Sequence, residues 1–380
     1  MDPASRERFL LFQSFSPTIA NLVCLGCSAR FVRHRNGRLS GLAETERHMI
    51  SKENLYLLMR KGYEKIPVLH DVLLRRRIRR EWSKGKAGGF LPRQLAIETS
   101  SFCNAKCIMC PTQEMSRPRG FMSTELHRLV VDKVAEWRAP ISIISHAGLG
   151  EPLLDRGLFE KIQYEKKVFE GAQIAVYTNG SLLDGERSQM VLEAGVDELS
   201  FSLNAFRKET YEAVMKLAYE RTVENIHKFL EMNKAKGSPV KVHVSLIPTD
   251  LHSREEIDQF SQYWIEKVSS VAIPPLISWG GFLRHHQEKK QWPCRYLWEV
   301  FQVDWDGTVK MCCEDFDSRY PLGNIAELKP MKIFNSPRMQ KQRLDQVNGN
   351  FEWPEICRNC IESHEVARDF WKSASLASGA

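Results

Sequence analysis

Long apolar runs are absent from this sequence of 380 residues. No stretch reaches the roughly 18 uninterrupted apolar residues that a membrane-spanning helix needs. The nearest candidate, residues 9–27, is interrupted by polar residues and a proline: Gln13, Ser14, Ser16, Pro17 and Asn21. The start of the chain carries acidic Asp2 and Glu7 and lacks the Ala-x-Ala cleavage pattern of a signal peptide. We therefore expect a cytoplasmic protein without a membrane span.

A strong excess of charge of one sign is also missing. The 54 lysines and arginines outnumber the 47 acidic residues by only seven, a diffuse charge that suits an anionic small molecule but does not indicate nucleic acid. The one dense basic run contains Arg75, Arg76, Arg77, Arg79 and Arg80. We expect a solvated helix face there, and contact with acidic lipid, RNA or an acidic partner is the alternative.

Strand–helix alternation is missing before residue 93 and present after it. Residues 1–92 form a basic, mainly helical N-terminal extension that ends in a Gly/Lys-rich link. Helical patterns follow later, for example over 123–137, with Ser123 or Thr124 as N-cap, and over 208–237. Six short apolar or β-branched runs between such patterns predict strands: 94–99, 141–147, 173–178, 198–203, 240–247 and 268–273.

This alternation predicts parallel βαβ units and an α/β fold. No Gly-x-Gly-x-x-Gly segment follows the first strand, so we favour a partial (β/α)6 TIM-like barrel over residues 93–275 instead of a Rossmann sheet. Active sites of such barrels lie at the carboxyl ends of the strands.

Cysteine is plentiful, and its spacing argues against disulfides. The ten cysteines occur in tight groups in a large chain without a secretory signal, a pattern typical of metal or iron–sulfur ligands. They stand at positions 24 and 27, 103, 107 and 110, 294, 312 and 313, and 357 and 360.

The first candidate site is the C-x3-C-x2-C run of Cys103, Cys107 and Cys110, directly after the first predicted strand. Three thiolates from one loop can bind three irons of a [4Fe–4S] cube and leave the fourth iron open. An open coordination position is what a catalytic metal needs. A structural zinc loop is the alternative interpretation.

This spacing resembles the signature of the radical S-adenosylmethionine (SAM) superfamily. In that family the open iron binds SAM, which is cleaved to a 5′-deoxyadenosyl radical. Three segments at the ends of the next predicted strands resemble further family elements: HAGLGEP (146–152), YTNGSLL (177–183) and SFSLNA (200–205). The resemblance implies SAM contacts from Gly150, Glu151, Asn179, Ser202 and Asn204.

Two positions in these segments, Leu149 and Gly180, need separate comment. Leu149 stands where the family more often has a first glycine, which is a departure from its pattern. Gly180 is expected to adopt a positive φ in a tight turn above the barrel mouth.

A second group of cysteines lies near the C-terminus. Cys294, Cys312, Cys357 and Cys360 supply four thiolates, enough to complete a second [4Fe–4S] cluster or a four-cysteine zinc site. Residues 276–380 resemble the auxiliary-cluster domain called SPASM, in its shortened twitch form. The spacing also resembles the group that includes 2-deoxy-scyllo-inosamine dehydrogenase and related sugar epimerases. The resemblance implies SAM and two [4Fe–4S] clusters as cofactors.

Cys313 is left over from this set. It is a bystander, it replaces Cys312 as the ligand, or it returns a hydrogen atom to a substrate radical from the opposite face, which would make the enzyme an epimerase. Oxidation of an alcohol would instead need a base, for which the candidates are Arg284, His285, His286, Glu314 and Asp315.

Other residues with possible roles are tryptophans and an isolated pair of cysteines. Trp279, Trp292, Trp298 and Trp305 can stack on a sugar ring, although core packing is commoner for tryptophan. Cys24 and Cys27 are structural thiols or, with His34, part of a metal site.

The sequence as a whole predicts a radical SAM enzyme that removes hydrogen from a sugar, aminocyclitol or nucleotide-sugar, by dehydrogenation or epimerisation. A flavodoxin or ferredoxin would supply electrons. The alternative is a SPASM-type maturase that modifies a ribosomally made peptide.

Overall fold

The computed structural model describes residues 75–76, 78–84, 89–283 and 292–360. The chain divides into two units, Met1–Leu73 and Leu74–Ala380, and all that follows concerns the second. Most of the predicted N-terminal extension therefore lies outside the described residues. Six candidate residues lie outside them as well: Cys24, Cys27, His34, Arg284, His285 and His286.

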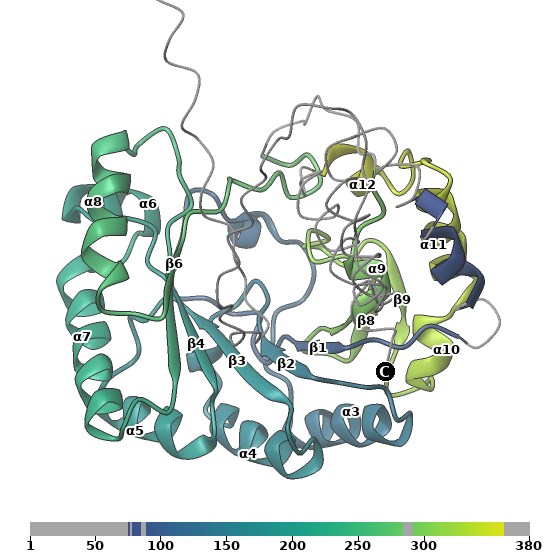
Figure 1. Ribbon diagram of the computed structural model, residues 1–380, viewed down its shortest axis with the longest axis horizontal. Coiled ribbons are helices and arrows are strands. Elements are labelled where there is room, and N and C mark those ends of the chain that lie inside the picture. The colour runs from purple at the N-terminus through teal and green to yellow at the C-terminus, as the bar shows by residue number, and fades with distance from the viewer. Residues whose placement is uncertain (1–74, 77, 85–88, 284–291, 361–380) are drawn as a thin grey trace, which may run out of the picture. The chain divides into compact units, whose positions relative to one another are not determined.

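The described part of the chain is organised around one nine-stranded sheet, in the order β6-β5-β4-β3-β2-β1-β7-β8-β9 (Figure 1). The first six strands run parallel to their neighbours and each lies within a predicted range, so the expected α/β fold is confirmed. The two edge strands do not pair with each other, so the barrel is partial, as predicted. Their bounds are β1 Gln94–Ile97, β2 Ile143–His146, β3 Gln173–Thr178, β4 Glu198–Ser202, β5 Lys241–Ser245 and β6 Ser270–Ala272.

Three further strands, which were not predicted from the sequence, continue the sheet beyond β1. Strand β7 (Val300–Val303) pairs in parallel with β1, with Gln94 opposite Val300 and Ile97 opposite Val303. Strands β8 (Thr308–Lys310) and β9 (Pro321–Asn324) then follow in antiparallel pairing. Segments about 200 residues apart in the sequence thus share one sheet.

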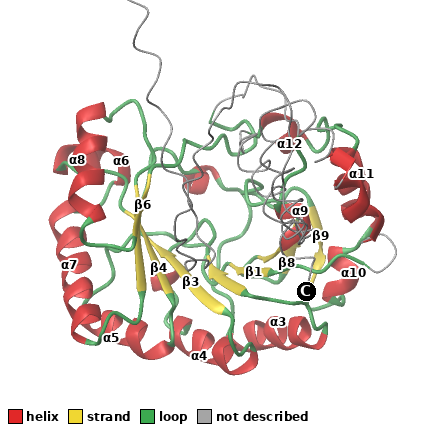
Figure 2. Ribbon diagram, viewed as in Figure 1, coloured by secondary structure: helices red, strands yellow, loops and turns green. Residues whose placement is uncertain are grey.

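Helices cover the outer face of the parallel strands (Figure 2). They are α3 Thr124–Glu136, α4 Leu158–Val168, α5 Gly185–Ala194, α7 Tyr219–Ala235 and α8 Arg254–Ile265. The predicted N-cap Ser123 accepts a hydrogen bond from the backbone N–H of Leu126 at 3.1 Å, which satisfies one free amide at the start of α3.

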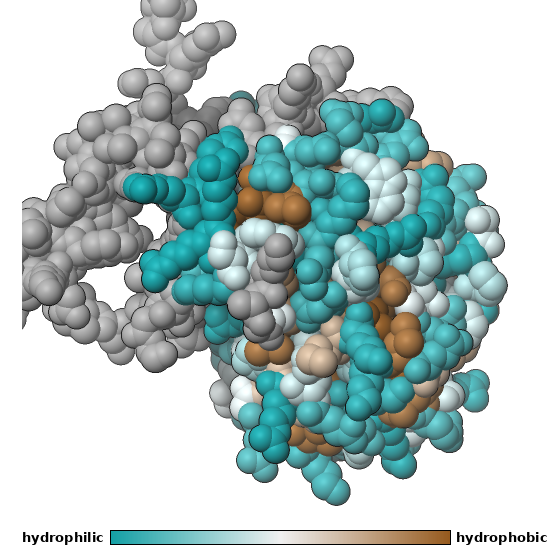
Figure 3. All heavy atoms as spheres, turned by 90° about the vertical axis from the view of Figure 1, so that its right-hand side faces the viewer, coloured by the Kyte–Doolittle hydropathy of each residue, from teal (hydrophilic) through white to brown (hydrophobic). Residues whose placement is uncertain are grey.

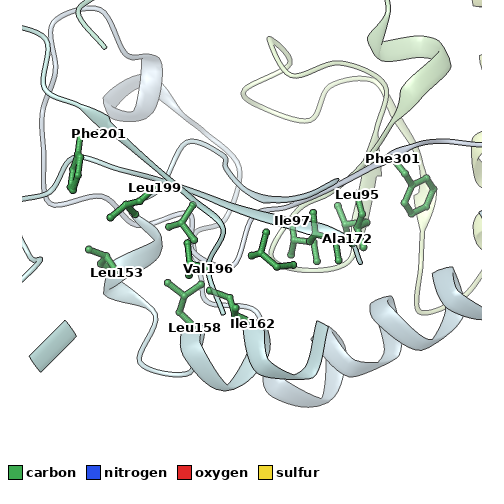
Figure 4. Close-up of a cluster of buried hydrophobic side chains, with 14 of the residues drawn as sticks. Leu95, Ile97, Leu153, Leu158, Ile162, Ala172, Val196, Leu199, Phe201 and Phe301 are labelled. Atoms are coloured by element: carbon green, nitrogen blue, oxygen red, sulfur yellow. The ribbon is translucent and has the colours of Figure 1, made fainter. Parts of the chain in front are cut away.

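The core lies between this helical layer and the sheet. Helices bury one stripe of apolar residues, as Val130 and Val134 of α3 do at a spacing of four. Residues from β1, α4, β4 and β7 point into the same layer, among them Ile97, Ile162 and Phe301 (Figure 4).

The predicted helical stretch 208–237 is two helices, so that prediction was wrong in its continuity. Helix α6 (Lys208–Met215) ends at Lys216, which has a left-handed φ of 57°, and α7 begins at Tyr219. The break frees carbonyls at the end of α6. Those of Val214 and Met215 accept backbone N–H groups from Ile108 and Lys106 in the loop after β1.

The C-terminal region adds short helices: α9 Tyr296–Glu299, α10 Pro330–Phe334, α11 Pro337–Val347 and α12 Glu355–Asn359. Figure 3 shows the side of the molecule that lies on the right in Figure 1, where α10 and α11 are found. On this face, hydrophobic residues form small separated patches among polar ones. None of the described helices is long and apolar enough to cross a membrane.

The arginine run lies in a helical segment, where residues 75–76 and 78–84 are helical. Its four described arginines are exposed, whereas Ile78 between them is buried. The predicted solvated helix face is therefore confirmed for the described arginines.

A buried charged group links α3, α4 and β2. The Glu165 carboxylate lies 2.6 Å from His127 Nε2 and 2.9 Å from His146 Nε2, and all three side chains are fully buried. Burial opposes ionisation of Glu165, but the two histidines outweigh it and lower the pKa of this carboxyl to about 2.

We predict that Glu165→Gln destabilises the fold by about 3 kcal/mol at pH 7, because it removes the charge that both histidines face. The carboxyl has a lowered pKa in the folded state, so its contribution is present above its ordinary pKa and disappears as the pH falls towards 2. The gap between wild type and variant should therefore shrink in acid. Urea unfolding of the apo-protein, followed by tryptophan fluorescence between pH 7 and pH 3, measures it.

The matched control is Glu160→Gln on the same helix, because Glu160 is exposed and forms its ion pair with exposed Arg128. That change should alter stability by less than about 0.5 kcal/mol. Equal effects of the two substitutions would contradict the assigned role of Glu165.

Candidate functional site

The first cysteine group lies in the loop that connects β1 to α3. Cys103, Cys107 and Cys110 precede a short 3-10 turn, Pro111–Glu114, and none of them forms a disulfide. The loop is held in place by the backbone bonds to the end of α6 and by Thr112, whose hydroxyl lies 2.8 Å from Cys110 Sγ and donates to the Leu149 carbonyl at 3.1 Å. The three thiols are thus anchored to neighbouring strand ends.

Two of these thiols, Cys103 and Cys107, resist ionisation in the absence of a cation. Burial raises the pKa of Cys103 to about 11, and neighbouring Glu151 and Cys110 add to the rise. Burial, followed by the repulsion of Cys110 and Cys103, raises the pKa of Cys107 to about 12. Thiolates are the form that binds metal, and bound iron would supply the positive charge that this group lacks. Three mutually interacting thiols from one loop therefore fit a three-cysteine cluster site.

Gly150 and Glu151 hold the same loop from the side of β2. A Cβ on Gly150 would lie 1.9 Å from the carbonyl oxygen of Ser100, so only glycine permits this approach. The N–H of Glu151 donates to the carbonyl of Phe102 at 2.8 Å. The buried Glu151 carboxylate accepts from Thr178 Oγ1 and from the N–H groups of Asn179 and Leu153, which ties β2 to β3.

Asn179 and Gly180 complete the third strand end. Asn179 donates from Nδ2 to Asn104 Oδ1 at 2.9 Å, and it also hydrogen-bonds the Cys103 thiol. Gly180 has a φ of +77°, which confirms the expected positive φ. The candidate residue Asn179 therefore lies beside the first cysteine group.

Asn204 and Met215 connect the fourth strand end to the same group. Asn204 is buried in a left-handed conformation, with φ of 58°, and accepts from the Ile247 N–H at 3.0 Å. The Met215 sulfur lies 3.2 Å from Asn204 Nδ2 and 3.4 Å from Cys107 Sγ. Ser202 is half-buried. Met215 belongs to no local motif, so its place in the site could not be predicted from the sequence.

The second cysteine group surrounds one cavity. Cys294 precedes α9, Cys312 follows β8, and Cys357 and Cys360 belong to α12 and its end, yet all four line the same space. In the described part of the chain, no three His, Cys, Asp or Glu side chains converge closely enough to hold a single metal ion. Four cysteines around a cavity fit the ligand set of a complete [4Fe–4S] cluster.

Acidic residues beside this cavity are committed to hydrogen bonds. Buried Glu314 accepts from the Cys360 thiol and the Gly280 N–H, both at 2.7 Å. Asp315 accepts from the backbone N–H groups of Arg319 and Tyr320. These contacts give both carboxylates a structural task. Cys313 hydrogen-bonds Cys312, and this bond, ahead of burial, raises the pKa of the Cys312 thiol.

The two cysteine regions are joined by short links. Asp317 accepts from the backbone N–H and the hydroxyl of Ser116, and Arg117 Nε donates to the Phe316 carbonyl at 2.9 Å. The guanidinium of Arg117 also bonds the buried Glu98 carboxylate at 2.7 Å. These links tie the loop after β1 to the segment that follows Cys312, and the sequence analysis did not predict them.

The four candidate tryptophans separate by environment. Trp292 and Trp298 are buried in the core, and the Trp305 indole donates to the Pro118 carbonyl. Trp279 is half-buried, has a left-handed φ of 51°, and donates from its indole to the Met109 carbonyl at 2.9 Å. Of the four, Trp279 is the one whose indole bonds the backbone between Cys107 and Cys110.

Two protein families match this chain, one over each of the two cysteine groups. Residues 97–261 match the radical SAM superfamily, and residues 294–361 match SPASM, an iron–sulfur cluster-binding domain. The chain therefore carries a radical SAM domain and a SPASM domain. These domains imply [4Fe–4S] clusters and SAM as cofactors, and they make the protein an enzyme.

Three curated relatives illustrate the range of this family. Over 332 residues the chain is 29% identical to a tungsten-containing aldehyde ferredoxin oxidoreductase cofactor-modifying protein of Pyrococcus furiosus, covering 74% of this chain and 90% of that one. It is 23% identical over 269 residues to the SAM-dependent 2-deoxy-scyllo-inosamine dehydrogenase of Niallia circulans, covering 70% and 91%. An AdoMet-dependent heme synthase of Methanosarcina barkeri is 34% identical over 138 residues, 36% of this chain and only 38% of the synthase.

Solved structures support the fold alone. BtrN in complex with AdoMet and 2-DOIA is similar with a TM-score of 0.50 at 22% identity, covering 72% of this chain and 94% of that one. SuiB of Streptococcus suis bound to its precursor peptide SuiA is similar with a TM-score of 0.57 at 13% identity, covering 74% and 73%.

We predict that Gly150→Ala weakens iron binding by the first cysteine group, because the new Cβ would collide with the Ser100 carbonyl and displace the loop. Iron in the reconstituted protein should fall from about eight to about four atoms per chain. Gly185→Ala is the control, since a Cβ there meets nothing within 4 Å. Full iron content in Gly150→Ala would show that the loop tolerates the shift.

Proposed function

We propose that this enzyme removes hydrogen from an alcohol carbon of a sugar, aminocyclitol or nucleotide-sugar and oxidises it to a ketone. Cys103, Cys107 and Cys110 would hold the first cluster, and Cys294, Cys312, Cys357 and Cys360 the auxiliary cluster. When bound, the first cluster and SAM supply the 5′-deoxyadenosyl radical that accepts the hydrogen atom.

The observation that carries this proposal is the cavity lined by all four C-terminal cysteines, linked to the first cysteine loop through Asp317 and Phe316. Oxidation of an alcohol to a ketone releases a hydrogen atom, a proton and an electron. The auxiliary cluster would take the electron, and a base would take the proton. The 2-deoxy-scyllo-inosamine dehydrogenase similarity, over most of both chains, supports a cyclitol-type substrate.

The chain's own residues would position SAM and the substrate. Gly150, Glu151, Asn179, Ser202 and Asn204 are the proposed SAM-side residues, and four of them belong to the hydrogen-bonded strand ends around the first loop. The half-buried Trp279 indole, which donates to the Met109 carbonyl in the cysteine loop, offers a face for a substrate ring. A flavodoxin or ferredoxin in a reducing cytoplasm is the proposed electron source.

Epimerisation and peptide maturation are the competing outcomes. A thiol at Cys313 facing the substrate would return hydrogen to the carbon, whereas the hydrogen bond between Cys313 and Cys312 favours a place beside the auxiliary cluster. The fold similarity to SuiB with its precursor peptide keeps peptide maturation as the second candidate.

The first test is anaerobic reconstitution followed by addition of dithionite and SAM. We expect about eight irons per chain and formation of 5′-deoxyadenosine, which is lost on Cys107→Ala. Gly185→Ala again serves as the control. About four irons would remove the auxiliary cluster from the proposal, and no 5′-deoxyadenosine with any candidate substrate would remove the radical chemistry.

The second test separates the outcomes for the substrate. Candidate cyclitols, sugars, nucleotide-sugars and peptides are incubated with enzyme and SAM in D2O, and the products are analysed by mass spectrometry. We expect a ketone product two mass units lighter than the substrate, unchanged in Cys313→Ala. Deuterium on carbon that disappears in Cys313→Ala would establish an epimerase, and a modified peptide would establish a maturase.

A further inference from the structure

Gln346 of α11 lines the four-cysteine cavity, and Gln342 lies one turn before it. Gln342 and Gln346 stand four residues apart and both side chains are fully or almost fully buried. Each amide donates from Nε2 to Cys357 Sγ at 3.6 Å. Gln346 also accepts from the Cys294 N–H at 2.8 Å through its Oε1. Two neutral donors thus converge on one cysteine sulfur.

Burying these amides costs free energy, and hydrogen bonds to a charged sulfur would offset that cost. Gln342 Oε1 is buried and has no hydrogen-bond partner among the described residues, and leaving a buried polar atom unsatisfied costs about 1–3 kcal/mol. An apolar residue would fill this position without that cost. A thiol is a weak acceptor, whereas a metal-bound thiolate is charged and accepts stronger hydrogen bonds. The two amides therefore suit a thiolate at Cys357.

A buried cation on the same helix is a second, independent observation. Arg343 is fully buried and lies against the rings of Phe90, Phe334 and Trp298, with no carboxylate partner among the described residues. Its Nε donates at 2.7 Å to the carbonyl of Leu297, a residue that lines the cavity. Burial lowers the pKa of Arg343 to about 9, which leaves the guanidinium charged at neutral pH. Buried charges are normally paired, and an anionic cluster would provide compensating charge.

We propose that Gln342 and Gln346, on the same helix as the buried cation of Arg343, are positioning residues that hold the Cys357 sulfur and raise the reduction potential of the auxiliary cluster. This inference rests on the proposed auxiliary cluster. Reduction adds negative charge to a cluster and its sulfurs, so donors and cations nearby stabilise the reduced form more than the oxidised form. The arrangement would make the cluster a better acceptor for the electron that leaves the substrate.

The test measures the auxiliary cluster alone. In the full chain, Cys103, Cys107 and Cys110 are changed to alanine, so that only the second cysteine group can bind a cluster. The protein is reconstituted anaerobically, its iron is counted, and a redox titration is followed by electron paramagnetic resonance. Gln342→Leu should lower the midpoint potential and reduce the ratio of reduced to oxidised cluster up to about tenfold, which is about 59 mV for a one-electron couple.

Two further variants make the result specific. Gln340→Leu is the matched control, because Gln340 lies on the same helix but donates to the Asn335 carbonyl. It should leave the potential unchanged. Gln342→Asn keeps an amide but shortens it, and it should lower the potential in the same direction as Gln342→Leu.

The outcomes separate this inference from the proposed function. About four irons per chain with an unchanged potential in both Gln342 variants would overturn the role of the glutamines and leave the auxiliary cluster in place. No iron in the triple-alanine protein would overturn the auxiliary cluster and the inference together. Equal shifts in Gln340→Leu and Gln342→Leu would show a general effect of α11 and contradict the specific hydrogen bonds.

Discussion

Parallel pairing of β1 with β7 is the constraint on which the rest of the site depends. Strand β1 has the barrel strand β2 on one side and a strand from the SPASM domain on the other. The loop that follows β1 carries the first three cysteines, and the segment after β8, two strands along, carries Cys312. One continuous sheet therefore positions both cysteine groups. Hydrogen bonds that Asp317 and Phe316 accept from the first cysteine loop add a second connection between them.

The two cysteine groups share one electrostatic property, because each contains at least one thiol whose pKa is raised. The pKa values of Cys103, Cys107 and Cys312 are all raised, so neither pocket is arranged to hold free thiolates without a cation. Three cysteines in one and four in the other are the ligand sets of an open and a complete four-iron cluster. In our proposal the difference in ligand number separates the two tasks, since one cluster binds SAM and the other accepts an electron.

Much of the barrel and the cysteine groups could be predicted from the sequence because their signals are local. Alternating apolar runs predicted six strands, and the cysteine spacing predicted both groups. Contacts between distant segments leave no such signal. The pairing of β1 with β7, the bond from Trp279 to Met109 and the glutamines behind Cys357 became apparent only in the structure. The break after Met215 was also missed, because the carbonyls that it frees serve a loop about 100 residues earlier.

Glu151 illustrates how a motif can conceal a structural task. Its match to the family element implied a contact with SAM, yet its carboxylate accepts three hydrogen bonds, two of which join the end of β2 to the end of β3. Gly150 likewise permits the backbone of the cysteine loop to approach. Around the first loop, the residues proposed to bind SAM also build the pocket.

The most direct test of the central claim is electron–nuclear double resonance with SAM labelled with 15N at its amino group. Two full-length variants are compared, one with alanine at Cys294, Cys312, Cys357 and Cys360 and the other with alanine at Cys103, Cys107 and Cys110. We predict 15N coupling to the reduced cluster in the first variant and none in the second. Coupling in the second variant, or in neither, would contradict the assignment of an open iron to the first cysteine group.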